Sequence, residues 1–292
     1  VREIGDPPLH FAKDIEMKSD LTDLRYLYQY GEYITENEKG TARFLNTFSQ
    51  KEIDAMARTY TEGFRKCFLV ARKDLSKKKT VSIRFLIGFE RMIRAAILQF
   101  REMGLEPVIS RGARRMWVAG ASANKQYDYD HRNDEALYLN EDLVKRRLRA
   151  MQVKYDEYKE LADGYAGPAV VETFGEVPFE PVNKKQALHL NERQQKLRVG
   201  FQNEAGQIVN RYIKDDEYGY TIIAYPMPEI DPRYEKIFRE IVKINTLDYE
   251  KYQRIQQYLI DALDEGVSVH VLGKGENRTD LLVMLHHLND PV

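Results

Sequence analysis

One βαβ pattern constrains the fold more than any other feature of the sequence. Apolar residues alternate over 81–87, which predicts a β-strand. They then recur at helical spacing over 89–103, Gly104 suits the left-handed position that ends a helix, and a second strand follows over 106–110. A strand, a helix and a strand in such close succession form one βαβ unit. This unit predicts a parallel sheet with helices packed against it.

The rest of the sequence continues this alternation. Further strands are predicted over 169–174, 220–225, 267–272 and 281–285, and helices over 50–75, 140–162 and 187–214, with two more that begin at Asp231 and Asp248. The pattern predicts an α/β fold with a mostly parallel sheet and flanking helices, of the Rossmann-like kind. We expect residues 1–55 to form a helical N-terminal extension and residues 56–292 to form the α/β domain.

The last two predicted strands leave one choice open. They flank the glycine-containing loop 273–279, so they form either a hairpin or two closely spaced strands of the main sheet. The five consecutive apolar residues 281–285 are typical of a parallel strand that is covered on both faces. We therefore predict that this strand is buried and central, and that Val283→Asp would unfold the domain.

Composition argues against several classes of protein. The net charge is −1, from 45 Lys and Arg against 46 Asp and Glu, so no overall field attracts nucleic acid or an anionic membrane. The apolar runs are far shorter than the about 18 residues that cross a bilayer, and the start Val1-Arg2-Glu3 has no secretory pattern, so we expect a cytoplasmic protein. The single cysteine, Cys67, excludes an intramolecular disulfide and a multi-cysteine zinc cluster, and we expect a core or boundary thiol.

One segment combines several potential metal ligands. Asp128, Asp130, His131 and Asp134 lie within seven residues, and carboxylate oxygens with an imidazole could hold a hard or borderline cation. The spacing lacks the sixth-position glycine and twelfth-position glutamate of an EF-hand loop. A solvated loop with tyrosines packed beneath it is the favoured interpretation.

Three other segments resemble ligand sites only in part. His286 and His287 follow the last strand, where neighbouring side chains face opposite sides, so a surface or interface role is favoured over a shared metal. The loop 273–279 lacks the spacing of a phosphate loop, and no helix follows it to bind an anion. The turn 87–90 has one glycine where a dinucleotide fingerprint needs three, and Glu90 would repel a pyrophosphate.

A small basic and aromatic patch is the remaining candidate. Arg111, Arg114, Arg115 and Trp117 could bind single-stranded nucleic acid, but with a net charge near zero we favour a loop that packs on the domain. The sequence has no His-Glu-x-x-His and no Gly-x-Ser-x-Gly motif, and none of its six histidines form a helical i, i+4 pair. No catalytic, cofactor-binding or metal-ligating residue is therefore assigned.

The C-terminal part carries a resemblance to a known family. Tyr-Thr-Ile-Ile-Ala-Tyr-Pro at 220–226 precedes one helix, and Asn-Thr-Leu-Asp at 245–248 precedes another. The segments 267–272 and 273–283 follow, and the second includes Thr-Asp-Leu at 279–281. This order resembles the thermophilic metallo-aminopeptidase family typified by aminopeptidases T and S, which are leucyl aminopeptidases.

The resemblance covers roughly residues 60–290 and includes the βαβ unit. In the family, a strand that ends in Ala-Tyr-Pro precedes two helices, and a Gly-x-Gly-Thr-Asp-Leu stretch then leads into the catalytic domain. This sequence departs from that pattern because Glu-Asn-Arg is inserted at 276–278.

The resemblance implies a broad-specificity exopeptidase that removes N-terminal residues from peptides. It implies two bridged divalent ions, zinc or cobalt, whose ligands lie after the Thr-Asp-Leu strand in a second domain. That domain is expected beyond residue 292, so no metal is expected in this chain alone. A homodimer is implied, with no nucleic-acid or membrane partner. The alternative function is a non-catalytic α/β binding or interaction module.

Overall fold

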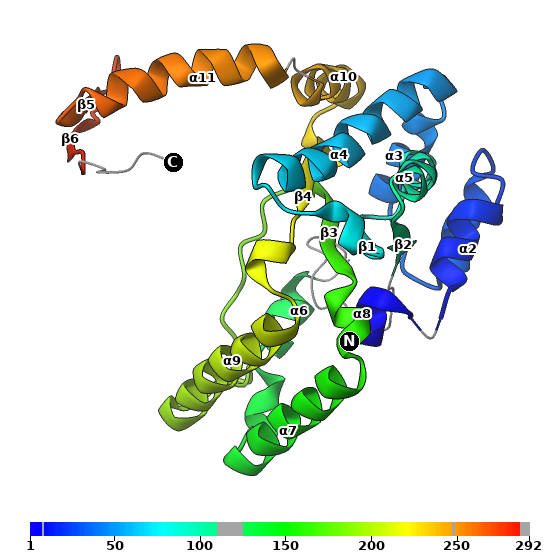
Figure 1. Ribbon diagram of the computed structural model, residues 1–292, viewed down its shortest axis with the longest axis vertical. Helices are drawn as coiled ribbons and strands as arrows, with labels where there is room; N and C mark the ends of the chain where they lie inside the picture. Colours follow the sequence, from blue (N-terminus) through cyan, green and yellow to red (C-terminus); the bar gives the residue numbers. More distant parts are fainter. Residues whose placement is uncertain (8, 110–124, 247–248, 287–292) are drawn as a thin grey trace. The chain divides into compact units, whose positions relative to one another are not determined.

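The computed structural model describes residues 1–7, 9–109, 125–246 and 249–286 (Figure 1). The chain forms two compact units, Val1–Asn245 and Thr246–Val292. The units therefore divide after helix α10 (Tyr234–Asn245), whereas the sequence suggested a boundary at residue 55.

A four-stranded parallel sheet forms the centre of the first unit. It contains β1 (Thr80–Arg84), β2 (Glu106–Val108), β3 (Tyr165–Phe174) and β4 (Thr221–Pro226), in the order β2-β1-β3-β4. Each neighbouring pair of strands is parallel. The predicted α/β, Rossmann-like fold class is confirmed, and β1, α5 (Glu90–Glu102) and β2 form the predicted βαβ unit.

Helices make up most of the remainder of this unit. The other α-helices are α1 (Arg2–Gly5), α2 (Phe11–Lys18), α3 (Glu36–Leu45), α4 (Gln50–Val70), α6 (Lys125–His131), α7 (Glu141–Glu157), α8 (Lys159–Asp163) and α9 (Glu192–Tyr212). Short 3-10 helices are η1 (Leu24–Tyr30), η2 (Leu75–Lys77), η3 (Asp134–Leu137), η4 (Asp215–Glu217) and η5 (Pro228–Ile230).

The main core joins one face of the sheet to helices α4, α5 and α10. Val81 of β1 belongs to the same buried cluster as Phe64 of α4 and Ile93 of α5. Phe238 of α10 stacks on Tyr225 of β4 with ring centroids 5.0 Å apart. The odd-numbered residues of β1 face this core, as the alternation in the sequence predicts.

Residues 1–55 are largely helical, as predicted, but they are part of the same core. Leu27 of η1 and Leu45 of α3 are fully buried in it. The suggested boundary at residues 55 and 56 lies inside α4, whose start is fixed by a capping box between Ser49 and Glu52. These residues therefore behave as an integral part of the unit and not as an appendage.

Helices α7 and α9 lie side by side (Figure 1). A small separate cluster of Leu139, Val144 and Leu190 holds them together. The helix predicted over 140–162 is divided into α7 and α8 at Tyr158, and the one predicted over 187–214 begins five residues later than expected, at Glu192.

The second unit contains helix α11 (Tyr249–Asp264) and the strands β5 (Ser268–Leu272) and β6 (Asp280–Met284). The two strands pair antiparallel as a hairpin, with Val269 opposite Val283. Of the two alternatives that the sequence left open, the hairpin is confirmed, and the prediction that these strands join the parallel sheet is wrong. The physical reason is the loop length, because a parallel connection needs a crossover of a dozen or more residues and 273–279 is too short.

The prediction that the last strand is buried is also wrong. Leu281 is 53% exposed and Val283 is 41% exposed. Within the described residues β6 pairs with β5 alone, so its apolar side chains lack the cover that a central strand receives on both faces.

Candidate functional site

The carboxyl edge of the parallel sheet is the first place to look for a site. In open α/β sheets, ligands bind outside the carboxyl ends of the strands, where the strand order reverses. Here β1 lies between β2 and β3, so this point falls between the loops that follow β1 and β3. The turn 87–90, considered above as a nucleotide turn, lies here.

This turn binds a carboxylate of its own chain. Glu90, in the first turn of α5, is fully buried, and its Oε2 accepts hydrogen bonds from the Gly88 backbone N–H at 2.9 Å and the Tyr26 hydroxyl at 2.6 Å. Gly88 has φ +112°, and a Cβ there would lie 2.9 Å from the Glu38 carbonyl oxygen, so the turn requires glycine. Glu90 thus occupies the helix end where an anionic ligand would otherwise bind.

Tyr26 completes this arrangement. Burial and the neighbouring Glu90 carboxylate raise the pKa of Tyr26 well above its ordinary value, so the phenol keeps its proton and remains a donor. The sequence indicated that Glu90 would repel a phosphate, but gave no sign of Tyr26 as its partner. The two residues are 64 positions apart, so no local spacing connects them.

The acidic segment 128–134 does not converge on one point. Asp130 forms an ion pair with Lys184 at 3.0 Å, while His131 Nδ1 lies 2.7 Å from Asp134 Oδ2. The His131 ring also packs on Tyr127, with centroids 4.2 Å apart. In the part of the chain that the structure describes, no three His, Cys, Asp or Glu side chains are placed to hold a metal.

The other histidines, the cysteine and the basic patch named in the sequence analysis do not come together in one site within the described residues. His286 is exposed just beyond β6. His287 and the patch Arg111, Arg114, Arg115 and Trp117 lie outside the described residues. Cys67 is a half-buried free thiol, which fits a boundary position. On the hairpin, His270 Nε2 lies 2.7 Å from Asp280 Oδ1, a pairing that requires the antiparallel register and was not foreseen.

One charged turn at the amino edge of the sheet has a structural role. Lys78, within the lysine run that follows α4, is buried, and its Nζ donates to the Asp163 carbonyl oxygen at 2.7 Å and to Glu217 Oε2 at 3.2 Å. This residue ties the end of α8 to η4 at the amino edge of the sheet.

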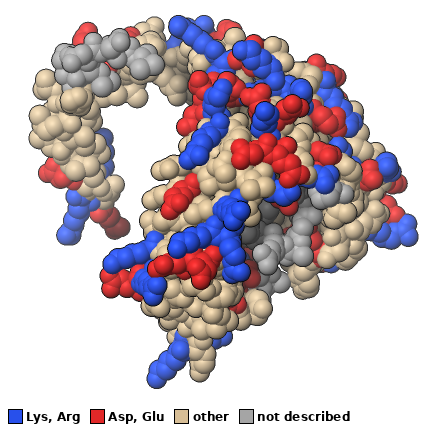
Figure 2. All heavy atoms as spheres, turned by 60° about the horizontal axis from the view of Figure 1, so that its bottom comes forward, with Lys and Arg blue, Asp and Glu red and all other residues tan. Residues whose placement is uncertain are grey.

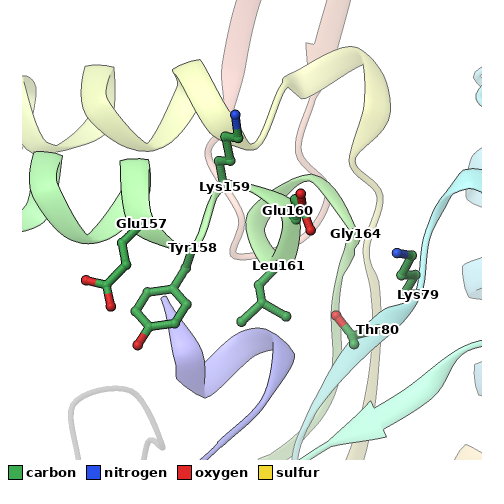
Figure 3. A pocket seen from close by; sticks show the side chains of 8 residues that line it. All are labelled: Lys79, Thr80, Glu157, Tyr158, Lys159, Glu160, Leu161 and Gly164. Atoms are coloured by element: carbon green, nitrogen blue, oxygen red, sulfur yellow. The ribbon is translucent and has the colours of Figure 1, made fainter.

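A pocket of about 360 Å³ lies at the amino end of β1 (Figure 3). Figure 3 shows that the charged side chains of Glu157, Lys159 and Lys79 point in different directions. The backbone N–H groups of Lys79 and Thr80 both donate to the Gly164 carbonyl oxygen, at 2.7 and 3.1 Å. The pocket thus offers space, but its side chains do not aim at a common reacting atom.

A more open groove of about 520 Å³ runs between α7 and α9. Val144, Leu197 and Phe201 contribute its apolar lining, and Arg193 on its rim bonds to Glu141 at 2.8 Å. Figure 2 shows positive and negative side chains intermixed over the visible face of the protein, as expected from a net charge of −1.

Among the described residues, every helix is too short or too polar to cross a membrane. Compared with protein-family models and with curated proteins, the chain matches none.

Proposed function

We propose that this chain is the α/β amino-terminal part of a cytoplasmic metal-dependent aminopeptidase. The observation that carries the proposal is the order of elements over 220–283. Strand β4 ends in Ala-Tyr-Pro, helices α10 and α11 follow, and Thr-Asp-Leu lies at the start of β6. This is the order of motifs on which the resemblance to the aminopeptidases rests.

In this proposal the first unit has a structural task. It would form a wall of the substrate cavity and present a surface to a second copy of the protein, while peptides with a free α-amine are the substrates. The turn 87–90 supports a structural task for the first unit. At this turn the buried Glu90 side chain fills the position where ligands usually bind in this kind of fold.

The described residues do not fit a dinuclear metal site. Such a site holds two ions about 3.5–4 Å apart and needs several convergent carboxylates and imidazoles. The described residues hold no such group. The zinc or cobalt ligands of the proposed enzyme would therefore come from sequence other than these residues.

The test compares two forms of the protein on two substrates. The protein with its downstream coding sequence should hydrolyse leucine-p-nitroanilide with added zinc or cobalt, and a chelator should abolish turnover. N-acetyl-leucine-p-nitroanilide, which lacks the free amine, should not be cleaved. The 292-residue chain alone should show neither turnover nor a tightly bound metal.

The alternative is a non-catalytic α/β binding module. A stop codon directly after residue 292, or a longer protein that is inactive with every metal tried, would favour the module. Turnover by the 292-residue chain would place the active site within it, and Asp128, Asp130, His131 and Asp134 would be the first residues to replace.

A further inference from the structure

The segment 176–184 follows strand β3 and is attached to helix α6 by polar contacts. None of its residues belongs to either of the buried apolar clusters of the first unit, and α6 has no buried residue among those that the structure describes. The contact between the segment and the helix therefore depends on charges and hydrogen bonds. Contacts of this kind each contribute little to stability, because water offers the same groups competing partners.

An ion pair lies at each end of the segment. Lys125 Nζ is 2.6 Å from Glu176 Oε2, and Lys184 Nζ is 3.0 Å from Asp130 Oδ2. None of these four side chains is fully buried. Dissolved ions can therefore screen both pairs, and salt should weaken the attachment at its two ends.

The middle of the segment is bound through its main chain. The Val182 N–H donates to Gln126 Oε1, and Gln126 Nε2 donates to the Val182 carbonyl oxygen, both at 2.9 Å. The Tyr129 hydroxyl donates to Asn183 Oδ1. Gln126 Nε2 also donates to Asp130 Oδ1 at 2.9 Å, so the hydrogen bonds of the middle are connected to the ion pair at one end. Hydrogen bonds that are connected in this way strengthen one another.

We propose that segment 176–184 is a latch that opens from α6 and closes on it as one unit, and that salt shifts the latch toward its open form. The segment begins at the carboxyl end of β3, where the Val177 N–H donates to Glu229 Oε2 of η5 at 3.3 Å. Helix α6 lies in the connection that follows β2. The latch therefore decides whether the connections after β2 and β3 are held together. The proposal rests on contacts within the first unit and not on peptidase activity.

Hydrogen exchange of the Val182 amide measures the opening, because this N–H is bonded to α6 only while the latch is closed. Glu176→Gln and Lys184→Gln each remove one ion pair. The matched controls are Glu180→Gln and Lys185→Gln, which change nearby residues of the same type that form no ion pair with the described residues. None of the four positions adjoins Val182, so the intrinsic exchange rate of its amide stays the same.

Glu176→Gln and Lys184→Gln should each raise the exchange rate of the Val182 amide roughly threefold, and the two controls should leave it unchanged. Raising sodium chloride from about 0.05 M to about 1 M should speed this exchange in the parent protein, and should have no effect in the variant that lacks both ion pairs. The amide of Ile93, in the buried core of α5, should respond to none of these changes, which shows that the fold is intact.

Two kinds of result would contradict the latch. A faster exchange in only one of the two ion-pair variants would rule out opening as one unit. A Val182 amide that exchanges at the rate of an unfolded peptide in the parent protein, or at one rate in every variant and at both salt concentrations, would overturn the proposal altogether.

Discussion

Tyr26→Phe tests the buried network at the carboxyl edge of the sheet. The change removes one hydroxyl and leaves the ring in the core, so packing is almost unchanged. Glu90 Oε2 then keeps the Gly88 N–H as a donor but loses the Tyr26 hydroxyl, which lies at 2.6 Å. A hydrogen bond to a buried charged group contributes about 1.5–3 kcal/mol, so we expect a loss of about 2 kcal/mol in the free energy of unfolding.

Urea unfolding followed by circular dichroism measures this loss. With a denaturant slope of about 3 kcal/mol per M, the midpoint should fall by about 0.7 M. Tyr28→Phe is the matched control, since Tyr28 lies in the same 3-10 helix but is exposed, and its midpoint should not move. A Tyr26→Phe variant within about 0.5 kcal/mol of the parent would refute the role given to this hydroxyl.

The same residue predicts a response to alkaline pH. Because the pKa of Tyr26 is raised in the folded protein, the folded state keeps a proton that the unfolded state releases near pH 10. The contribution of the protonated Tyr26 phenol to the free energy of unfolding is therefore fully present below about pH 10 and is lost as pH rises above that value. Burial also raises the pKa of Tyr165 and Tyr234, each to about 12, so Tyr26→Phe should reduce the alkaline loss of stability without abolishing it.

Three further changes test other parts of the structure. Hydrogen bonding from Arg101 lowers the pKa of Glu106 from 4.5 to about 2, so its contribution is present above about pH 4.5 and is lost as pH falls toward 2. When the free energy of unfolding is measured as the pH is lowered, the Glu106→Gln variant should lose less than the parent protein. The exposed control Glu102→Gln should lose as much as the parent. Lys78→Met should cost about 1–3 kcal/mol in urea unfolding, whereas the same change at the preceding, exposed lysine should cost almost nothing. Val283→Asp should lower the free energy of unfolding by less than about 1 kcal/mol, because Val283 is exposed; a collapse in thermal stability would show that β6 is covered after all.

Local patterns in the sequence predicted the elements well. The alternation over 81–87 and the helical spacing that follows became β1 and α5, because apolar periodicity reports which side of an element faces the core. The helix predicted from residue 140 begins there as α7, with Asn140 as its N-cap. Such signals lie within one turn or one strand, so a single sequence contains them in full.

Pairings between distant segments were harder to predict. The apolar run in β6 suggested a buried strand, but the short loop before it allows only an antiparallel partner, and loop length should have outweighed composition. No local pattern marks Lys78 as a buried residue, because its partners, Asp163 and Glu217, are 85 and 139 residues away. The Glu90 and Tyr26 contact was missed for the same reason.

The use of the carboxyl edge connects the fold to the proposed function. A parallel sheet with this strand order provides a ligand position at the start of the helix after β1, where backbone N–H groups and the helix dipole attract negative charge. In this chain Glu90 supplies that charge from within and is buried there with Tyr26. Because Glu90 fills this position and is hydrogen-bonded there, the turn contributes to the stability of the fold and holds no room for a ligand anion at this point. This arrangement supports the proposal of an aminopeptidase whose metal ligands lie in another domain over a nucleotide-dependent enzyme that binds its ligand at this edge.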